Sequence, residues 1–192
     1  MRNAELPHRK RCHRINTPGH AHYLTFSCYH RQPFLSRDRS RQWLLDAINL
    51  ARAKHVFDLW AWVIMPEHAH LILFPTQPTY DISAILATIK LSVTRKALAF
   101  VKSTAPGFLA RMEDRQPNGT TAYRFWQRGG GYDRNLVSPE EIWEKIQYLH
   151  DNPVKRDLSK TPDEWTWSSA ADYSGVRTGL LKLDLDSLPR RR

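Results

Sequence analysis

An apolar stretch at residues 63–74 is interrupted by Pro66 and Glu67, and the residues that follow contain two histidines flanking one alanine. Proline presets the backbone angle that the first central position of a tight turn requires, so the pair predicts a two-residue connection between two strands. Side chains alternate along a strand, and the second strand therefore presents His68 and His70 on one face and its leucines on the other. At a rise of about 3.3 Å per residue the two imidazoles stand about 6.6 Å apart at their alpha carbons, near enough to share one ligand.

A histidine pair of this kind has two interpretations. The commoner one is a pair of hydrogen-bonded histidines in a core strand, and the other is a site for a metal ion or a phosphate. A second pair, His20 and His22, straddles a predicted turn and the start of a strand, so we expect it to bind no ligand. The rest of the chain decides how His68 and His70 are to be interpreted.

The composition indicates one basic domain with tails. The chain has 192 residues, enough for one substantial core and too few for two. Its 29 Lys and Arg against 19 Asp and Glu give a formal charge of +10, which favours a polyanionic partner such as nucleic acid. A merely soluble basic protein would carry the same charge, so the inference needs other support.

The absence of other signals sets the expected location. No apolar run approaches the roughly 18 residues that a membrane span needs, and no secretory leader opens the sequence. The two cysteines form neither a Cys-x-x-Cys pair nor a disulfide framework, which argues against a structural zinc. We therefore expect a cytoplasmic protein with no membrane partner.

The order of the predicted elements indicates an α+β fold. Strands are predicted at residues 22–29, 57–65, 68–74 and 123–126, and helices at residues 37–54, 80–102 and 138–152. The first six elements follow the order of the ferredoxin-like split β-α-β sandwich, an antiparallel sheet with helices whose first and third strands are central. Residues 103–121 contain prolines, glycines and mixed charges and are predicted to be a loop.

The chain divides into three predicted parts. Residues 1–19 form a basic arm, residues 20–153 the ferredoxin-like domain, and residues 154–192 an aromatic extension that ends in a basic tail. A glycine-rich loop at residues 127–134 could approach a sugar-phosphate backbone closely, although a plain glycine turn is as good an interpretation.

The third helix has a strong start signal and a polar flank. Ser138 is a capping residue followed by a proline and, three residues later, by a glutamate. At about 100 degrees per residue, Tyr148 and Asn152 lie together beside the apolar stripe of this helix. Pro153 disfavours helical geometry in the residue before it, so the amide of Asn152 lies on the terminal turn.

The third helix is the element available to cover the histidine face of the sheet. In that position it brings Tyr148 and Asn152 toward His68 and His70. Two imidazole nitrogens and an amide oxygen suit Mg²⁺ or Mn²⁺, which would polarise a phosphodiester. A tyrosine hydroxyl is a poor nucleophile until a cation or base assists it, so the set predicts metal-dependent phosphodiester cleavage by Tyr148.

These residues form part of a longer series of motifs. The motifs are Met65-Pro-Glu-His-Ala-His-Leu-Ile72, Phe125-Trp-Gln-Arg128, Tyr132-Asp-Arg134, Tyr148-Leu-His-Asp-Asn-Pro-Val-Lys155 and Trp165-Thr-Trp-Ser-Ser169. Together they resemble the REP-associated tyrosine transposases, which belong to the single-tyrosine transposase branch of the HUH endonucleases. The resemblance implies a metal ion on His68, His70 and Asn152, and a nucleophilic Tyr148 that forms a 5′-phosphotyrosine link to single-stranded DNA.

The resemblance also implies the partner. The family cuts beside repetitive extragenic palindromes that fold as hairpins, and its members act as monomers or homodimers. Residues expected to contact DNA are Arg9, Lys10, Arg11, Arg14, Lys90, Arg95, Lys96, Arg128 and Arg134. The main alternative is a ferredoxin-like module that binds single-stranded RNA or DNA without cutting it. A hydrolase of small phosphoesters fits the basic charge poorly.

Overall fold

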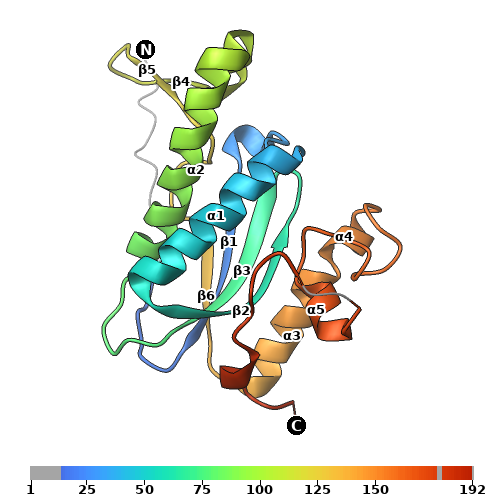
Figure 1. The fold of residues 1–192 in the computed structure, drawn as a ribbon. Coiled ribbons are helices and arrows are strands. Elements are labelled where there is room, and N and C mark those ends of the chain that lie inside the picture. The colour runs from blue at the N-terminus through green and yellow to red at the C-terminus, as the bar shows by residue number, and fades with distance from the viewer. Residues whose placement is uncertain (1–13, 177–178, 192) are drawn as a thin grey trace, which may run out of the picture.

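A four-stranded antiparallel sheet forms the centre of the protein, whose computed structural model describes residues 14–176 and 179–191 (Figure 1). The strands lie in the order β2, β3, β1 and β6. Their bounds are Ala21–Ser27 for β1, Phe57–Ile64 for β2, His68–Pro75 for β3 and Tyr132–Leu136 for β6. The predicted α+β, ferredoxin-like order is confirmed, with β1 and β3 in the centre and both histidines on a central strand.

The hairpin that joins β2 to β3 has the predicted two-residue turn. Pro66 and Glu67 occupy the turn, and the backbone N–H of Met65 donates to the carbonyl of His68 over 2.8 Å. The turn therefore fixes where β3 begins, and with it the face on which each side chain of β3 lies.

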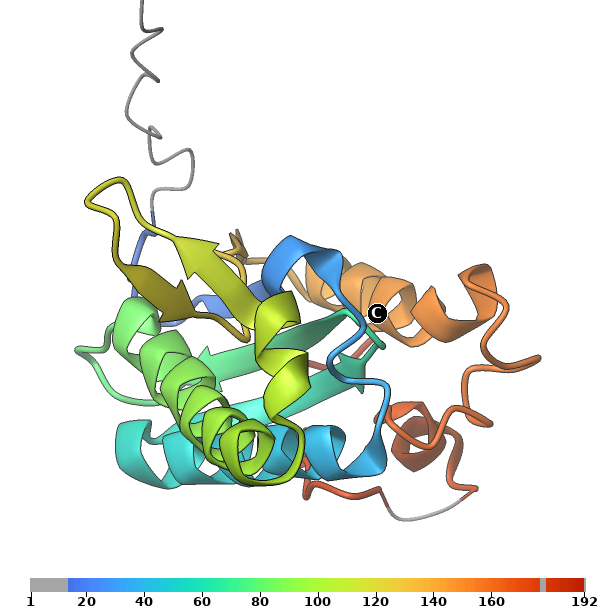
Figure 2. The ribbon, with the colours of Figure 1, turned by 90° about the horizontal axis from the view of Figure 1, so that it is seen from above.

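Helices cover both faces of the sheet (Figures 1 and 2). Their bounds are Asp38–His55 for α1, Ile82–Thr104 for α2 and Pro139–His150 for α3. Leu71 and Leu73 are fully buried in the core beneath α1 and α2, whereas Ile72 is buried in a second core with the apolar stripe of α3. Each such side chain stabilises the fold by about 1.5–3 kcal/mol. As predicted, α3 lies on the face of β3 that carries the histidines.

The prediction of the fourth strand at residues 123–126 is wrong. Thr121–Tyr123 is β5, and it pairs with β4, Glu113–Arg115, in a separate two-stranded sheet. The fourth strand of the main sheet is β6, which pairs with β1 at the edge. Its sequence, Tyr-Asp-Arg-Asn-Leu, is mostly polar because an edge strand is only partly covered. Hydrophobic periodicity therefore did not find it.

The segment predicted to be a loop, residues 103–121, also contains regular structure. The 3-10 helix η2 spans Pro106–Met112 and leads directly into β4. Met112 is buried, and Phe108 packs against the core beneath α1 and α2. Elements of three to seven residues are too short to show a period in the sequence.

The aromatic extension after α3 runs along the open edge of β2. It begins within α4, Asn152–Lys155, and contains α5 at Ala170–Ser174 and the 3-10 helix η3 at Leu185–Ser187. Ile64 N–H donates to the carbonyl of Trp167 over 2.8 Å, and the indole N–H of Trp60 donates to Ser187 over 2.9 Å. The extension thereby protects a strand edge that would otherwise be open to pairing.

The predicted basic arm, residues 1–19, lies largely outside the described residues, which begin at residue 14. Within the described part of the chain, no helix combines the length and apolar character needed to cross a membrane.

Candidate active site

The two histidines of β3 meet at their Nε2 atoms. The Nε2 atoms of His68 and His70 lie 3.0 Å apart, and the two rings are nearly perpendicular. His70 is 6% exposed and His68 is partly exposed, so the pair lies at the edge of the second core, open on one side. Strand alternation is what brings the rings to one face, as the sequence predicts.

Oxygen atoms hold the opposite nitrogen of each ring. His68 Nδ1 is 3.1 Å from Glu67 Oε1, and His70 Nδ1 is 2.7 Å from the Tyr23 hydroxyl and 2.8 Å from Thr25 Oγ1. A carboxylate can only accept, so His68 donates from Nδ1 and carries a lone pair on Nε2. The two inner nitrogens bond to each other, and an outer oxygen that orients each ring is the arrangement found around metal-binding histidines.

Burial keeps both imidazoles neutral. It lowers the pKa of His70 to about 3, and the neighbouring His68 lowers it further. The pKa of His68 is also lowered by burial, with Glu67 acting in the opposite direction. Burial alone would raise the pKa of Glu67, but His68 and Arg156 together bring it below its usual value. At neutral pH the pair therefore presents uncharged nitrogens, the form that binds a metal ion.

Tyr148 lies beside the histidine pair on α3. Its ring centroid is 6.4 Å from the ring centroid of His70, and the side chain is 45% exposed. Lys155 Nζ lies 4.8 Å from the ring centre and Lys145 Nζ lies 5.7 Å from it. No residue in the ranges 14–176 and 179–191 makes a hydrogen bond to the Tyr148 hydroxyl. The oxygen is therefore accessible to a substrate, with two positive charges nearby.

Asn152 begins α4, one turn after Tyr148. Its amide nitrogen donates to the Tyr148 carbonyl over 2.8 Å, which fixes the amide by its nitrogen and leaves Oδ1 as an unused acceptor in the described chain. Among the described residues, no hydrogen bond joins Asn152 to either histidine. The metal-ligand role of Asn152 stays a prediction.

The side chains at the site suit a divalent cation that takes mixed ligands. No group of three or more His, Cys, Asp or Glu side chains in the described ranges could hold a metal ion. Two converging imidazole nitrogens therefore need oxygen donors of another kind, which an amide, a water or a phosphate can provide. The donor set fits Mg²⁺ or Mn²⁺ with open positions, and fits a closed structural zinc site poorly.

Sequence reasoning missed the residues that support the pair. Thr25 lies opposite His70 in the β1–β3 register, and the Arg156 guanidinium donates to Glu67 Oε1 over 2.9 Å. The strand register could have revealed Thr25 if the pairing had been worked out. Nothing in the sequence indicated Arg156, which reaches Glu67 from the turn after α4.

The second histidine pair, His20 and His22, differs from the first in the partners of its ring nitrogens. His22 is fully buried, and its two ring nitrogens bond to Asp133 Oδ1 over 2.9 Å and to the Tyr80 hydroxyl over 2.8 Å. Both nitrogens are thus used within the protein, which leaves no lone pair for a ligand. His20 lies outside this cluster, with Asn135 as its side-chain neighbour at 3.3 Å.

Two of the residues predicted to contact DNA support the glycine loop, and their contact with DNA stays a prediction. Arg14 donates to the carbonyl of Gly130 over 2.6 Å, and Lys90 donates to the carbonyls of Gln127 and Gly129 over 3.3 and 2.9 Å. Burial lowers the pKa of Lys90 to about 8. These two cations act as structural supports of the loop.

The other residues predicted to contact DNA differ in whether they form ion pairs within the protein. Lys96, Arg128 and Arg134 form ion pairs with Asp46, Asp114 and Glu141 respectively. Arg95 is exposed and forms no ion pair with a described residue. Arg9, Lys10 and Arg11 lie outside the described residues. Contact with DNA stays a prediction for all of them.

Comparisons with known proteins agree with the motifs. No family model matches the chain. A Haemophilus influenzae protein named "Putative REP-associated tyrosine transposase" is 24% identical over 140 residues, which are 69% of this chain and 74% of that protein. A solved structure of a REP-associated tyrosine transposase bound to a REP hairpin superposes with a TM-score of 0.66 at 20% identity, covering 96% of this chain and 99% of that one. The resemblance seen in the motifs is confirmed, and in both sequence and fold the chain is similar to the REP-associated tyrosine transposases.

Proposed function

We propose that the protein is a metal-dependent endonuclease and strand transferase, a transposase, which acts on single-stranded DNA beside hairpin-forming palindromes. The observation that supports this most directly is the position of Tyr148. Its accessible hydroxyl belongs to a ring 6.4 Å from His70, whose Nε2 converges with that of His68. A module that only binds nucleic acid has no need for this combination.

The reaction is a transfer between oxygen atoms. The Tyr148 hydroxyl oxygen attacks the phosphorus of a DNA phosphodiester, and the phenolic proton leaves to solvent. The bond from phosphorus to the 3′ oxygen breaks, and that oxygen takes a proton and becomes a free 3′ hydroxyl. The 5′ phosphate is now linked to Tyr148. Attack by another 3′ hydroxyl reverses the step and joins a new strand.

The residues of the site would hold a divalent ion. His68, His70 and Asn152 would be the ligands of Mg²⁺ or Mn²⁺, which would polarise the phosphate and offset the charge that develops on it. Neutral ligands leave the full charge of the ion available for this purpose. The outer contacts from Glu67, Tyr23 and Thr25 keep the imidazoles oriented without adding a ligand.

The lysines beside Tyr148 add positive charge where a phosphate must approach. Lys155 and Lys145 both lie within 6 Å of the ring centre. Lys145 Nζ also pairs with Glu144 over 2.6 Å, whereas the contact between Lys155 and Asp151 is longer, at 3.9 Å. Lys155 is therefore the better placed of the two to attract DNA to the nucleophile.

Hairpin DNA is the substrate that the comparisons suggest. The solved relative was bound to a REP hairpin, and this chain carries a formal charge of +10. Positive charge of this size favours association with nucleic acid of any sequence. Recognition of a particular palindrome would depend on base contacts in addition.

The test is formation of a covalent adduct. Labelled hairpin DNA with single-stranded flanks is incubated with the protein and Mn²⁺ and then run on a denaturing gel. We expect DNA that migrates with the protein, no such band without metal, and none for Tyr148→Phe. Binding without any adduct would favour the non-cleaving module, and an adduct retained by Tyr148→Phe would assign the nucleophile to another tyrosine.

A further inference from the structure

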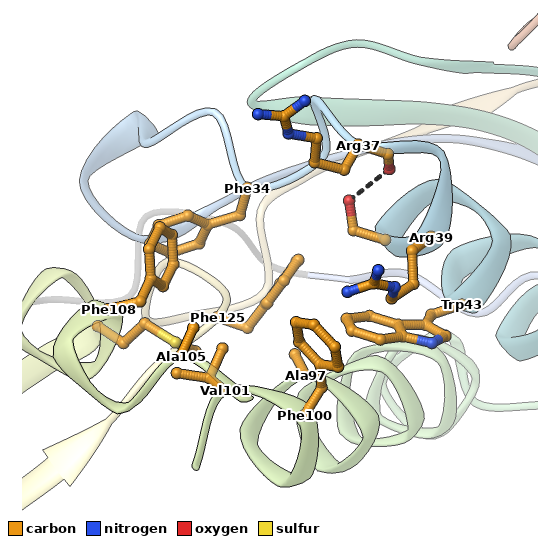
Figure 3. A pocket seen from close by; sticks show the side chains of 12 residues that line it. Phe34, Arg37, Arg39, Trp43, Ala97, Phe100, Val101, Ala105, Phe108 and Phe125 are labelled. Atoms are coloured by element: carbon orange, nitrogen blue, oxygen red, sulfur yellow. Dashed lines mark hydrogen bonds between the residues drawn. The ribbon is translucent and has the colours of Figure 1, made fainter. Parts of the chain in front are cut away.

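An aromatic pocket lies between the start of α1 and the end of α2, in the helical layer (Figure 3). Its volume is about 170 Å³, smaller than the roughly 300–1,000 Å³ of sites for drug-sized ligands. It therefore has room for one small ring system. Phe34, Trp43, Phe100, Phe108 and Phe125 contribute the rings that line it.

Arginines without carboxylate partners surround this aromatic pocket. Arg37 and Arg39 are exposed and line its mouth, and Arg111 lies beside it with its guanidinium 4.9 Å from the ring centre of Phe108. The guanidinium of Arg39 lies 4.0 Å from the ring centre of Phe100. None of the three forms an ion pair with any residue that the structure describes. The charge at the mouth is thus available to an anion.

The pocket lies at the same end of the sheet as the histidine pair. The segment between β1 and α1 forms part of its wall, and two backbone hydrogen bonds join that segment to the turn before His68. Leu35 N–H donates to the carbonyl of Pro66 over 2.9 Å, and Cys28 N–H donates to the carbonyl of Glu67 over 2.8 Å. The histidine pair lies on the face of the sheet that α3 covers and the pocket lies on the face that α1 and α2 cover, so a DNA strand would pass around this turn to reach both.

We propose that the aromatic pocket receives the base of one unpaired nucleotide of the DNA, with the phosphates on either side of it held by Arg37 and Arg39. A base has flat faces that stack on aromatic rings, and it is joined to phosphates that match the free guanidiniums. A purely apolar ligand would use the rings but not the arginines. The proposal rests on the proposed function, because it takes single-stranded DNA to be the substrate.

The test removes one base at a time. Each unpaired nucleotide that flanks the hairpin is replaced in turn by an abasic site, and affinity is measured in the Tyr148→Phe background so that no cleavage intervenes. Stacking on aromatic side chains corresponds to about a 5- to 150-fold change in Kd. We expect one position at which loss of the base weakens binding by an amount in this range.

Variants that fill the pocket link the effect to it. Ala105→Leu adds bulk at the partly exposed mouth, where the fold should tolerate it, and Ala97→Leu adds bulk at the buried wall. Each should weaken binding of the intact DNA, and the abasic substitution should then cause no further loss. Arg95→Gln is the control, since an exposed arginine outside the pocket should affect intact and abasic DNA equally.

Independent effects of the pocket variants and the abasic site would overturn the proposal, as would the lack of any sensitive position. These results can be separated from failure of the proposed function. If the hairpin is bound and forms the Tyr148 adduct but no base couples to the pocket, only the base-binding proposal fails. If neither binding nor adduct is seen, the proposed function fails as well.

Discussion

At the scale of single residues, the orientation of the imidazoles depends on side chains that bond to their outer nitrogens. Glu67 accepts from His68 and is itself held by Arg156, while Thr25 and Tyr23 hold His70. The geometry of the Nε2 pair is therefore set by four oxygen and nitrogen contacts behind it. Such outer contacts commonly change metal affinity by about 10- to 100-fold when they are removed.

Tyr148→Phe should abolish covalent attachment to DNA and leave the fold unchanged. The hydroxyl has no hydrogen-bond partner in the described chain, so its loss should alter the free energy of unfolding by less than about 0.5 kcal/mol. Hairpin binding in the absence of cleavage should persist. Thermal unfolding, a binding titration and the denaturing gel together check this. A large loss of stability would show that the oxygen has a structural role.

Glu67→Ala should weaken the binding of Mn²⁺ by about 10- to 100-fold, because His68 would lose the acceptor that fixes its ring and its tautomer. Direct titration of the metal by calorimetry measures this without relying on activity. The matched control is Glu113→Ala, which removes a carboxylate whose partner Arg115 is mostly exposed. Equal metal affinity in both variants would mean that Glu67 does not orient the site.

The sequence predicted which side chains lie together better than it predicted their supports. His68, His70 and Tyr148 lie close together as predicted, because strand and helix periods place side chains on a face without knowledge of distant partners. Arg156 was not found, because its contact with Glu67 depends on the path of the chain after α4. For the same reason, the sequence did not indicate the ion pairs of Lys96, Arg128 and Arg134, three residues predicted to contact DNA.

At the scale of elements, the start of α3 holds the helix that carries Tyr148. Ser138 Oγ accepts from the backbone N–H of Glu141 over 3.1 Å, and the Glu141 carboxylate accepts from the N–H of Val137 over 3.2 Å. Ser138→Ala should therefore cost about 1 kcal/mol of stability and lower the Tm by about 2–4 °C. Calorimetry of this variant beside Ser36→Ala, an exposed serine with no cap role, tests it.

Lys90, which supports the glycine loop before β6, should make the stability of the protein depend on pH. Because burial lowers the pKa of Lys90 to about 8 from 10.5, the unfolded chain binds more protons than the folded one between these two values. The contribution of Lys90 to stability should therefore rise as the pH increases from about 8 toward 10.5, and should be constant below that window. The difference in unfolding free energy between wild type and Lys90→Met, measured from pH 7 to 10, isolates it. A difference that does not vary with pH would contradict the prediction.

The elements that hydrophobic periodicity predicted are those that bury a continuous face. α1, α2, α3, β1, β2 and β3 lie within two residues of their expected bounds, since each contributes to one of the two cores. β6 was missed because it is a polar edge strand, and β4 with β5 because three residues show no period. The topology of a split β-α-β unit requires a fourth strand even where the sequence of that strand does not predict it.

At the scale of the whole molecule, we expect binding to DNA to depend less on the total surface charge than on the cations that have no ion-pair partner. The formal charge is +10, yet Arg128, Arg134 and Lys96 are ion-paired, and Arg14 and Lys90 support a loop. We therefore expect contacts to phosphates chiefly from cations without an ion pair among the described residues, such as Arg37, Arg39 and Arg95, and from residues 1–13 of the basic arm.

The salt dependence of hairpin binding tests this view. Each phosphate neutralised releases counterions, so about five to seven contacts on partly single-stranded DNA should give a slope of log affinity against log salt of roughly −4 to −6. Arg95→Gln should reduce the magnitude of the slope by less than one unit, and Arg128→Gln should change it less, because the charge of Arg128 is partly offset by Asp114, a carboxylate that it shares with Arg124. Deleting residues 1–13 should reduce it by several units if the arm contacts DNA.

Measuring affinity at four salt concentrations for the wild type and these three variants decides between the outcomes. An unchanged slope after the deletion would mean that the arm does not contact phosphates, and a larger effect of Arg128→Gln than of Arg95→Gln would mean that ion pairs within the protein open on binding.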